Sequence, residues 1–438
     1  MEGTPTSELL AWYDAGHRVS TDTRSIQPGD LYFALKGERF DGNRYAQQAL
    51  ETGAYRAIVD DANLAGQPGM VWVEDGLGAL QDLARAHRRR FQGRVLGMTG
   101  SNGKTTTKEL LLQVLSQRFH AVATKGNLNN EIGVPLTLLS MPVDADFAIV
   151  EMGANAVGEI AELCRIAEPD WGLITNIGLA HLEGFGGPEG VKRGKRELFQ
   201  FLAESPDSRV FVNASKTNLL EVSEGQNRTL FGTPEHLPHA ELVAPPPPGF
   251  GAISAFEFHC GDDGLTGPHA MNMDGAHNLE NALVALVVGH ACGVPWEAGL
   301  AAVAAYTPTN NRSQWVQTER NRVLLDAYNA NPSSMERALK TFAEGEHPRP
   351  LAILGDMGEL GDHGPYEHRR IAQVAVDLGL EVWLVGDLFS EAAAEIGLQG
   401  YRQASELLAE LERQAVSDRT VLLKGSRSLE LESALPFL

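Results

Sequence analysis

The chain has 438 residues, of which 43% are hydrophobic and 21% are charged. A chain of this length exceeds what one hydrophobic core usually organises, so we expect two or three domains. Its formal net charge of -21 disfavours a general nucleic-acid-binding protein, because such proteins need a basic face to displace counterions. We find no basic-then-apolar leader and no apolar run of bilayer length, and therefore expect a cytoplasmic protein without membrane insertion. The three cysteines (Cys164, Cys260 and Cys292) are scattered, which is typical of reduced structural thiols.

Residues 1–92 predict a small α/β domain. Apolar runs at 30–35, 55–59 and 70–73 are typical of strands, and residues 45–50 and 77–91 are typical of helices. Two loops of this domain are polar: residues 20–24 place hydroxyls around an arginine, and residues 36–42 carry cations between glycines. Backbone N–H groups and cations in such loops can hold a phosphorylated ligand, but two solvated connecting loops would show the same spacing.

Residues 95–106 form the clearest motif of the chain. An apolar run leads into a glycine-rich turn, and the turn leads into a helix with apolar residues at helical spacing. The backbone N–H groups of such a turn, added to the positive end of the helix, form an anion site. Lys104 would reach the outer phosphates of a nucleotide, and the Thr105 hydroxyl would ligate magnesium. Met98 replaces the first glycine of the strict P-loop pattern, so the motif is a shortened form. The residues that we assign to this loop are Gly100, Ser101, Asn102, Gly103, Lys104, Thr105 and Thr106.

We therefore predict that the chain binds a nucleoside triphosphate. The alternative is a tight strand-to-helix turn that contains a lysine by chance. Such a turn has no need for a strand, glycines, Lys-Thr and a helix in this order, so the order favours nucleotide binding.

Residues 93–306 predict a central domain with a mostly parallel sheet, because apolar strands at 147–150, 172–175 and 210–212 alternate with helical stretches. Glu151 directly follows one strand, at the sheet edge where ligands of open α/β sheets bind. There it either ligates magnesium or serves as a surface cap or ion-pair partner.

Three further polar stretches lie in this predicted domain. Residues 126–135 are rich in amides, among them Asn129 and Asn130, which can donate to and accept from a phosphate–magnesium cluster. His181 lies shortly after a strand and either binds a second metal as a neutral imidazole or is structural. Lys195 lies among cations, which usually marks a solvated face; as an ammonium it can touch phosphate but cannot ligate magnesium.

The end of the central domain contains a proline run and a long apolar helix. Residues 244–249 predict a stiff linker, and residues 253–260 with the turn at 261–264 predict an edge hairpin. The helix opens near residue 275 and runs to about residue 292. His277, Asn278 and Asn281 share its first turn, where they either face an adenine or ribose or cap the helix.

Residues 307–438 predict a third α/β unit with strands at 323–327, 351–354, 382–385 and 421–423. Three polar loops follow these strands, at 326–334, 355–361 and 424–428. Because the carboxyl ends of parallel strands meet at one edge, we expect the three loops to share one rim of the sheet.

Ten short motifs of the chain stand in the order found in one protein family. They are STDTR with LKGERFDGN, TGSNGKTTTKE, GNLNNEIGVPLTLL, EMGAN, AHLEGFG, HNLENA, DAYNANPSSM, GDMGELG and KGSRS. The motifs cover nearly the whole length, and several are far more specific than the P-loop alone. The chain resembles the Mur ligases of peptidoglycan synthesis, most closely those members that add a dipeptide.

The resemblance implies an α/β fold of three domains. These are an N-terminal UDP-sugar-binding domain at 1–92, a central P-loop ATPase domain at 93–306 and a C-terminal Rossmann-like domain at 307–438. The cofactors implied are ATP and Mg²⁺. Lys195 stands where the family typically carries a carbamylated lysine (N6-carboxylysine), which would turn a cation into a carboxylate-like group able to help hold magnesium.

The resemblance also implies roles for individual residues. Lys104, Glu151, His181 and Lys195 would be catalytic, and Thr105, Glu151, His181 and Lys195 would form the metal site. Beyond the P-loop, the nucleotide would be held by Asn278, Asn281, Arg312, Asn329 and Asn331. The substrates would be held by Ser20, Thr21, Arg24, Lys36, Gly37, Phe40, Asp41, Asn129, Asn130, Lys424 and Arg427.

The implied reaction joins D-Ala-D-Ala to UDP-N-acetylmuramoyl-tripeptide through an acyl phosphate made from ATP. We expect a monomer that binds no nucleic acid. One alternative is a sister ligase that adds a single amino acid, or a ligase of the folylpolyglutamate type. An alternative of another class is a non-catalytic ATP-binding module, against which the complete set of metal-site residues argues.

Overall fold

The computed structural model describes residues 3–37, 40–243, 254–261, 267–308, 311–345 and 347–438. The chain divides into two compact units. The first comprises Met1–Met98, Phe119–Gly153 and Glu159–Gly172, and the second comprises Thr99–Arg118, Ala154–Gly158 and Leu173–Leu438. No helix within the described ranges is both long enough and apolar enough to span a bilayer. The domain boundaries predicted from the sequence, at residues 92 and 306, remain predictions.

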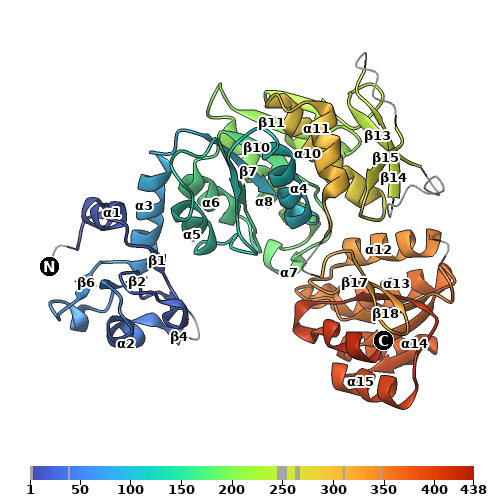
Figure 1. Ribbon diagram of the computed structural model, residues 1–438. Coiled ribbons are helices and arrows are strands. Elements are labelled where there is room, and N and C mark those ends of the chain that lie inside the picture. The colour runs from blue at the N-terminus through green and yellow to red at the C-terminus, as the bar shows by residue number, and fades with distance from the viewer. Residues whose placement is uncertain (1–2, 38–39, 244–253, 262–266, 309–310, 346) are drawn as a thin grey trace. The chain divides into compact units, whose positions relative to one another are not determined.

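The first unit contains a four-stranded parallel sheet in the order β1-β2-β5-β6, as Figure 1 shows in blue. Its core is formed by Tyr32, Ala57 and Val59 of the strands with Ala46 and Ala49 beneath them. The predicted strands and helices are confirmed here, while the loop at 36–42 contains a short antiparallel pair, β3 and β4, which we did not predict. The elements are α1 (Thr6–Asp14), β1 (Val19–Ser20), η1 (Thr23–Ser25), β2 (Leu31–Phe33), β3 (Lys36–Gly37), β4 (Phe40–Asp41), η2 (Gly42–Tyr45), α2 (Ala46–Glu51), β5 (Arg56–Val59), η3 (Ala62–Leu64), β6 (Met70–Trp72) and α3 (Gly76–Arg88).

A six-stranded sheet follows, in the order β12-β11-β10-β7-β9-β8. The pairs β7–β9, β8–β9 and β11–β12 are parallel, as the alternation of strands and helices predicted. The elements of this part are β7 (Arg94–Thr99), α4 (Lys104–Leu115), β8 (Ala121–Ala123), α5 (Gly133–Leu139), β9 (Phe147–Glu151), α6 (Glu159–Ala167), β10 (Trp171–Ile174), α7 (Leu182–Phe185), α8 (Pro188–Leu202), β11 (Arg209–Asn213), α9 (Thr217–Val222), β12 (Arg228–Phe231), α10 (Ala276–Ala291) and α11 (Trp296–Ala305).

A small antiparallel sheet lies between α9 and α10 in the chain. Its strands are β13 (His239–Val243), β14 (Ser254–His259) and β15 (His269–Met271), with β14 in the middle. The strand predicted at 253–260 is therefore confirmed as β14. The predicted proline linker and most of the predicted turn at 261–264 lie outside the described residues.

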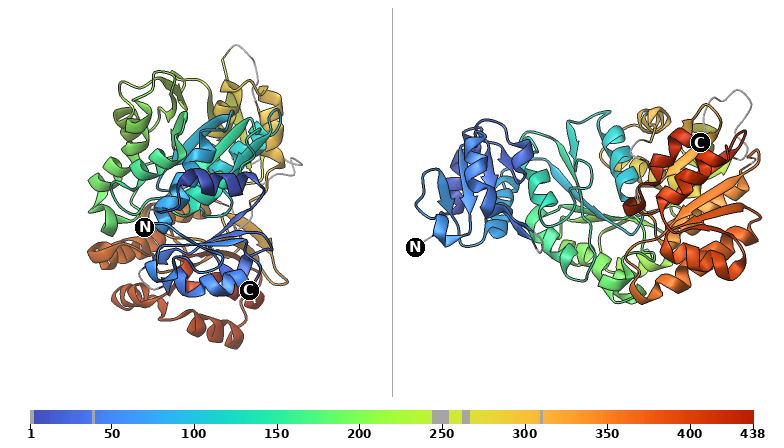
Figure 2. Two further views of the ribbon diagram at one scale, coloured as in Figure 1. Left: turned by 90° about the vertical axis from the view of Figure 1, so that its left-hand side faces the viewer. Right: turned by 90° about the horizontal axis from the view of Figure 1, so that it is seen from below.

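The last sheet has the order β16-β17-β21-β18-β19-β20 and is parallel except for its edge strand β16. Alternate residues such as Val323 and Ile353 pack against Leu407 and Leu411 of α15, while Leu324 and Leu422 on the opposite face are also buried. Helices cover both faces of this sheet (Figure 1, Figure 2), which explains why its strands are continuous apolar runs. The elements are β16 (Gln314–Gln317), β17 (Arg322–Asp326), α12 (Pro332–Glu344), β18 (Leu351–Gly355), η4 (Gly361–His363), α13 (Gly364–Asp377), β19 (Glu381–Val385), α14 (Asp387–Ile396), β20 (Gln399–Tyr401), α15 (Ala404–Arg413), β21 (Thr420–Lys424), η5 (Arg427–Leu429) and η6 (Leu431–Phe437).

Helices α4 and α10 pack closely against each other in the second unit. Gly289 of α10 allows this approach, because a Cβ atom there would lie 2.4 Å from Cγ1 of Val114 in α4. At the end of α11, the Tyr306 hydroxyl donates a hydrogen bond of 2.5 Å to Glu109 of α4. The helix that begins at the P-loop is thus held by two segments that follow it much later in the chain.

We predict that Gly289→Ala lowers the thermal unfolding midpoint of the protein. Overpacking against the stiff, β-branched Val114 costs about 1–3 kcal/mol, whereas the gain in helix propensity is only about 1 kcal/mol. The same substitution in a Val114→Ala background should be neutral or stabilising, because the space is then free. An equal loss in both backgrounds would contradict the close approach of the two helices.

Candidate functional site

The turn between β7 and α4 requires glycine at two positions. Gly100 has a φ of 150°, and a Cβ there would lie 1.9 Å from Oγ1 of Thr175. Gly103 has a φ of 77°, and its Cβ would lie 2.6 Å from Oδ1 of Asn281. Any side chain would therefore be strained and would clash, so the sequence pattern and the geometry of the loop agree.

The loop after β10 holds this turn from one side. The Thr175 hydroxyl donates to the carbonyl of Asn102 at 2.7 Å. Asn176 donates to the same carbonyl at 2.9 Å and accepts the Asn102 N–H at 3.1 Å. Ser101 and Gly178 exchange two further bonds, of 3.0 and 2.9 Å. Thr175 and Asn176 were not among the predicted site residues, although Thr175 ends the predicted strand at 172–175 and Asn176 follows it.

The side chains of the turn and of the first turn of α4 differ in exposure. Lys104 folds back over the turn, where its Nζ donates to the carbonyl of Gly100 at 2.6 Å. Thr105 is buried and Thr106 is half-buried. The predicted phosphate-binding residues are thus held together at the beginning of α4, with the lysine on the carbonyl side of the turn.

The first turn of α10 packs against the same loop. The Thr107 hydroxyl donates to Oδ1 of Asn281 at 3.1 Å, and Asn281 donates to Asn278 at 3.2 Å. Asn278 in turn donates to the carbonyl of Asp274 at 2.8 Å. Gly275 occupies the N-cap position of α10, so none of the predicted residues caps it through a side chain. The contact of Asn278 and Asn281 with a nucleotide remains a prediction.

Helix α12 meets the P-loop at Asn102. Asn331, the N-cap of α12, forms a capping box with Ser334 and donates to Oδ1 of Asn102 at 2.8 Å. Asn102 donates in turn to the hydroxyl of Ser333 at 3.0 Å. Asn331 therefore lies at the P-loop as predicted, whereas Asn329 is exposed and accepts the N–H of Ala330.

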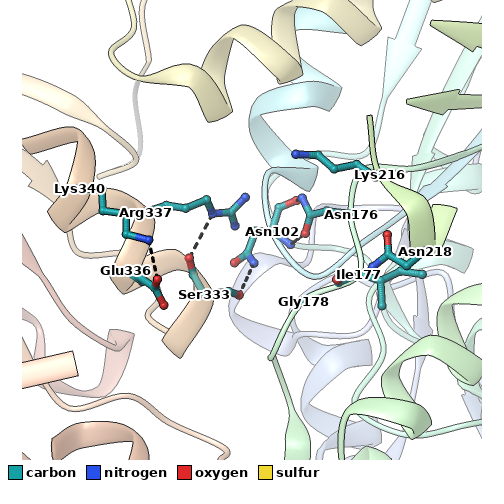
Figure 3. Close-up of a pocket in the computed structure, with 10 residues that line it drawn as sticks. All are labelled: Asn102, Asn176, Ile177, Gly178, Lys216, Asn218, Ser333, Glu336, Arg337 and Lys340. Carbon is teal, nitrogen blue, oxygen red and sulfur yellow. Dashed lines mark hydrogen bonds and ion pairs between the residues drawn. The ribbon is translucent and has the colours of Figure 1, made fainter. Parts of the chain in front are cut away.

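A pocket of about 300 Å³ lies beside Asn102, as Figure 3 shows. Two of its three cations already have carboxylate partners, since Lys216 contacts Glu280 at 2.5 Å and Lys340 contacts Glu336 at 2.7 Å. The third, Arg337, donates its Nε–H to the carbonyl of Ser333 at 3.1 Å and makes no ion pair within the described part of the chain. Burial lowers the pKa of this guanidinium below its ordinary value. The pocket is lined by Asn102, Asn176, Ile177, Gly178, Lys216, Asn218, Ser333, Glu336, Arg337 and Lys340.

His277 lies near this region in the first turn of α10. Burial, together with the positive charges of Arg337 and Lys424, lowers its pKa to about 4. The imidazole is therefore neutral near pH 7, and it cannot add a charge to the site.

Three loops of the last sheet meet at one rim, as predicted from their strands. Lys424 is almost fully buried, and its Nζ contacts Asp326 at 2.6 Å and the carbonyl of Asn329 at 3.3 Å. The backbone N–H of Ser426 donates to the carbonyl of Asp356 at 3.0 Å. Of the other predicted residues, Arg427 pairs with Glu432, and Arg312 lies over the Tyr328 ring at 3.9 Å from its centroid.

His181 and Lys195 belong to the second unit. His181 precedes α7 with a φ of 53°, and its Nδ1 pairs with Glu359, a contact that lowers the pKa of that carboxylate. Lys195 of α8 is 1% exposed, and its Nζ lies 5.2 Å from the centroid of the Phe185 ring.

Glu151 and Asn129 belong to the first unit. Glu151 ends β9 with 1% exposure, accepts a bond of 2.8 Å from Asn129 and donates its own N–H to Thr124 at 3.0 Å. Asn130 instead accepts the N–H of Gly133 at the start of α5. Across the described residues, no three His, Cys, Asp or Glu side chains gather as a ready metal site. A carboxylate, a hydroxyl, an imidazole and a carbamate are nevertheless suitable magnesium ligands, directly or through water.

The predicted UDP-binding loops lie in the first unit, where their described cations, Arg24 and Lys36, have carboxylate partners. Arg24 is bidentate to Asp22, whose pKa it lowers to about 2, and Lys36 contacts Asp60 at 2.8 Å. In the first loop, Ser20 donates to the Asp22 carbonyl at 3.1 Å and Thr21 is half-buried. In the second loop, Asp41 accepts a hydrogen bond from Asn43, and Gly37 pairs with Phe40 between β3 and β4. The Phe40 ring is 55% exposed, which is unusual for a phenylalanine and suits a stacking surface. Part of this loop, residues 38–39, lies outside the described residues.

Comparisons with known proteins cover nearly the whole chain. The Mur ligase family, catalytic domain, matches residues 16–88, the Mur ligase middle domain matches 98–289, and the Mur ligase glutamate ligase domain matches 311–427. The UDP-N-acetylmuramoyl-tripeptide–D-alanyl-D-alanine ligase of Bacillus subtilis is 33% identical, over 95% of this chain and 92% of the relative.

Two solved structures are similar to this chain. A crystal structure of MurF from Acinetobacter baumannii is 30% identical with a TM-score of 0.84, covering 95% of this chain and 92% of that one. MurF from Thermotoga maritima in complex with ADP is 26% identical with a TM-score of 0.83, covering 96% of each chain. From these matches, the chain belongs to the Mur ligase family.

Proposed function

We propose that this chain is an ATP-dependent, ADP-forming ligase that joins D-alanyl-D-alanine to UDP-N-acetylmuramoyl-tripeptide in peptidoglycan precursor synthesis. The observation that carries the proposal is the similarity over nearly the full length to a ligase of this name, at 33% identity. The ADP complex of a similar structure supports the use of ATP. The turn between β7 and α4, with Gly100 and Gly103 at positive φ before the first turn of the helix, supports a phosphate-binding role for the P-loop.

The reaction needs two group transfers. The tripeptide carboxylate attacks the γ-phosphorus of ATP, which forms an acyl phosphate and releases ADP. The amine of D-alanyl-D-alanine then attacks the acyl carbon, phosphate leaves, and the amine loses a proton as the amide forms. Lys104 neutralises charge on the outer phosphates, and the backbone N–H groups of the turn orient them. Magnesium, when bound, supplies further neutralisation, and Thr105, Glu151, His181 and carbamylated Lys195 are the residues we propose to hold it.

We further propose that the pocket beside Asn102 belongs to the nucleotide site, with Arg337 as an additional cation for the phosphates or ribose. The half-buried guanidinium makes no ion pair in the described part of the chain, which supports this role, because a partly desolvated cation is stabilised by a bound anion. The same proposal includes four further predictions from the sequence. They are UDP binding by the N-terminal loops, a cytoplasmic location, a monomeric state and three domains bounded near residues 92 and 306.

The test of the function is a coupled ADP assay with product analysis by mass spectrometry. We expect ADP, phosphate and the joined pentapeptide product in equal amounts, and only when UDP-N-acetylmuramoyl-tripeptide and D-alanyl-D-alanine are both present. Product formation with a single amino acid in place of the dipeptide would assign a sister ligase instead. ATP binding without any turnover would assign a binding module.

Lys195→Ala should abolish ligation, and short carboxylic acids such as acetate should partly restore it by replacing the carbamate. Lys192→Ala is the matched control, since Lys192 lies on the same helix and already pairs with Glu221. Its activity should stay near wild type and be insensitive to acetate. A carbamate signal in carbon-13 spectra after addition of labelled bicarbonate should appear in wild type and in Lys192→Ala but not in Lys195→Ala. Wild-type activity of Lys195→Ala without added acids would contradict the carbamate.

Arg337→Met should raise the KM for ATP by about tenfold, corresponding to about 1.4 kcal/mol, with a smaller change in kcat. The control is Arg369→Met, because Arg369 is exposed on α13 and pairs with Glu395. Steady-state kinetics at saturating peptide substrates provide the measurement. An unchanged KM for ATP would exclude Arg337 from the nucleotide site.

A further inference from the structure

Residues 356–361, which we call the 356–361 loop, run from the end of β18 to the first residue of η4 and carry Glu359. The loop presents Glu359 in a left-handed conformation, with a φ of 61°, so that its carboxylate pairs with Nδ1 of His181. The side chains on either side point inward, since Met357 and Leu360 are 4% and 2% exposed. A non-glycine residue in this conformation is strained, and its persistence requires that the rest of the loop be fixed.

The beginning of the loop is fixed by Asp356. Its carboxylate accepts the backbone N–H groups of Phe389 at 2.8 Å and Leu388 at 3.1 Å, in the first turn of α14. Its carbonyl accepts the N–H of Ser426 at 3.0 Å. These bonds hold Asp356 itself, but they do not reach the residues between Asp356 and Glu359.

His368 of α13 holds the next residue. Its side chain is fully buried, its Nε2 lies 2.9 Å from the N–H of Met357, and its Nδ1 lies 2.7 Å from the carbonyl of Gly364. A backbone N–H is a donor only, so Nε2 must be unprotonated and Nδ1 must carry the proton that is donated to Gly364. Both ring nitrogens are therefore used, one on each side of the ring. The Phe389 ring packs edge-on against the imidazole at 4.6 Å between centroids.

We infer that His368 is a positioning residue of the ligase, which fixes the backbone at Met357 and thereby holds Glu359 against His181. The inference rests on the proposed function and deepens it. A carboxylate that accepts the Nδ1–H of an imidazole fixes its tautomer and leaves Nε2 to face a ligand. The Glu359 carboxylate contacts Nδ1 of His181 and is therefore near enough to do this, and His368 places Glu359 without contacting His181 itself.

The first experiment compares two substitutions at the buried histidine. His368→Gln keeps an acceptor for the Met357 N–H and a donor for Gly364, whereas His368→Leu fills the space without either. We expect His368→Leu to lower kcat by about ten- to a hundredfold with little change in either peptide KM, and His368→Gln to recover most of this loss. His363→Gln, at an exposed histidine of η4 in the same region, is the control and should behave as wild type.

The second readout does not depend on activity. Hydrogen exchange measured by mass spectrometry on peptides spanning residues 355–362 should be about tenfold faster in His368→Leu and near wild type in His368→Gln. The same exchange in the control should be unchanged. Equal exchange in all variants would overturn the inference, even if the protein proved to have another substrate, because no substrate enters this measurement.

A double-mutant cycle separates positioning from general loss of structure. If His368 acts through Glu359, then adding His368→Leu to Glu359→Gln should cost little beyond Glu359→Gln alone. Additive losses in kcat, or a wild-type kcat for Glu359→Gln, would overturn the inference. Glu359 is at the surface, so its substitution tests the pairing with His181 even if His368→Leu does not fold. A wild-type enzyme that makes no product would instead refute the proposed function.

Discussion

The structure depends on a steric constraint at the turn between β7 and α4. Neither Gly100 nor Gly103 leaves room for a Cβ atom, because Thr175 lies against one and Asn281 against the other. Thr175 also donates a hydrogen bond to the Asn102 carbonyl of the turn, and Asn281 accepts the Thr107 hydroxyl in the first turn of α4. The neighbours that forbid a side chain therefore also hold the turn and the helix that follows it. Such a turn presents its N–H groups in a fixed arrangement before any anion arrives, which reduces the ordering cost of binding.

The sequence predicts the elements that lie inside the sheets and misses most of those at their edges, β6 being an edge strand that is mostly buried and was predicted. Strands such as β9, β18 and β21 are buried along their whole length and read as continuous apolar runs. β8, β12 and β16 pair on one side only and are largely half-buried, so their sequences carry little pattern. The same holds for α1, in which Leu9 alone is fully buried. The local pattern of apolar residues indicates which side chains are buried. Edge elements bury too few side chains for this pattern to be recognised.

For the site, the sequence identifies residues that follow strands and glycines but not the partners that hold them. Lys104, Thr105, Asn331 and Lys424 lie at the loops predicted for them. Asn176, Ser333 and Arg337 form hydrogen bonds whose partners or surroundings are set by the fold. The spacing of residues along the chain does not predict such contacts. Glu359 stood inside a motif that the sequence singled out, yet its role appears only through its contact with His181.

The bond between Lys104 and the Gly100 carbonyl has a consequence for nucleotide affinity. In the free protein the Lys104 ammonium already donates to the Gly100 carbonyl. A triphosphate that binds must therefore replace this carbonyl as the acceptor. Binding then becomes an exchange in which one charge-assisted bond to a neutral oxygen is traded for one to an anionic oxygen. The net gain is the difference between the two, and an anion with little charge density, such as a sulfonate, would hardly displace the carbonyl.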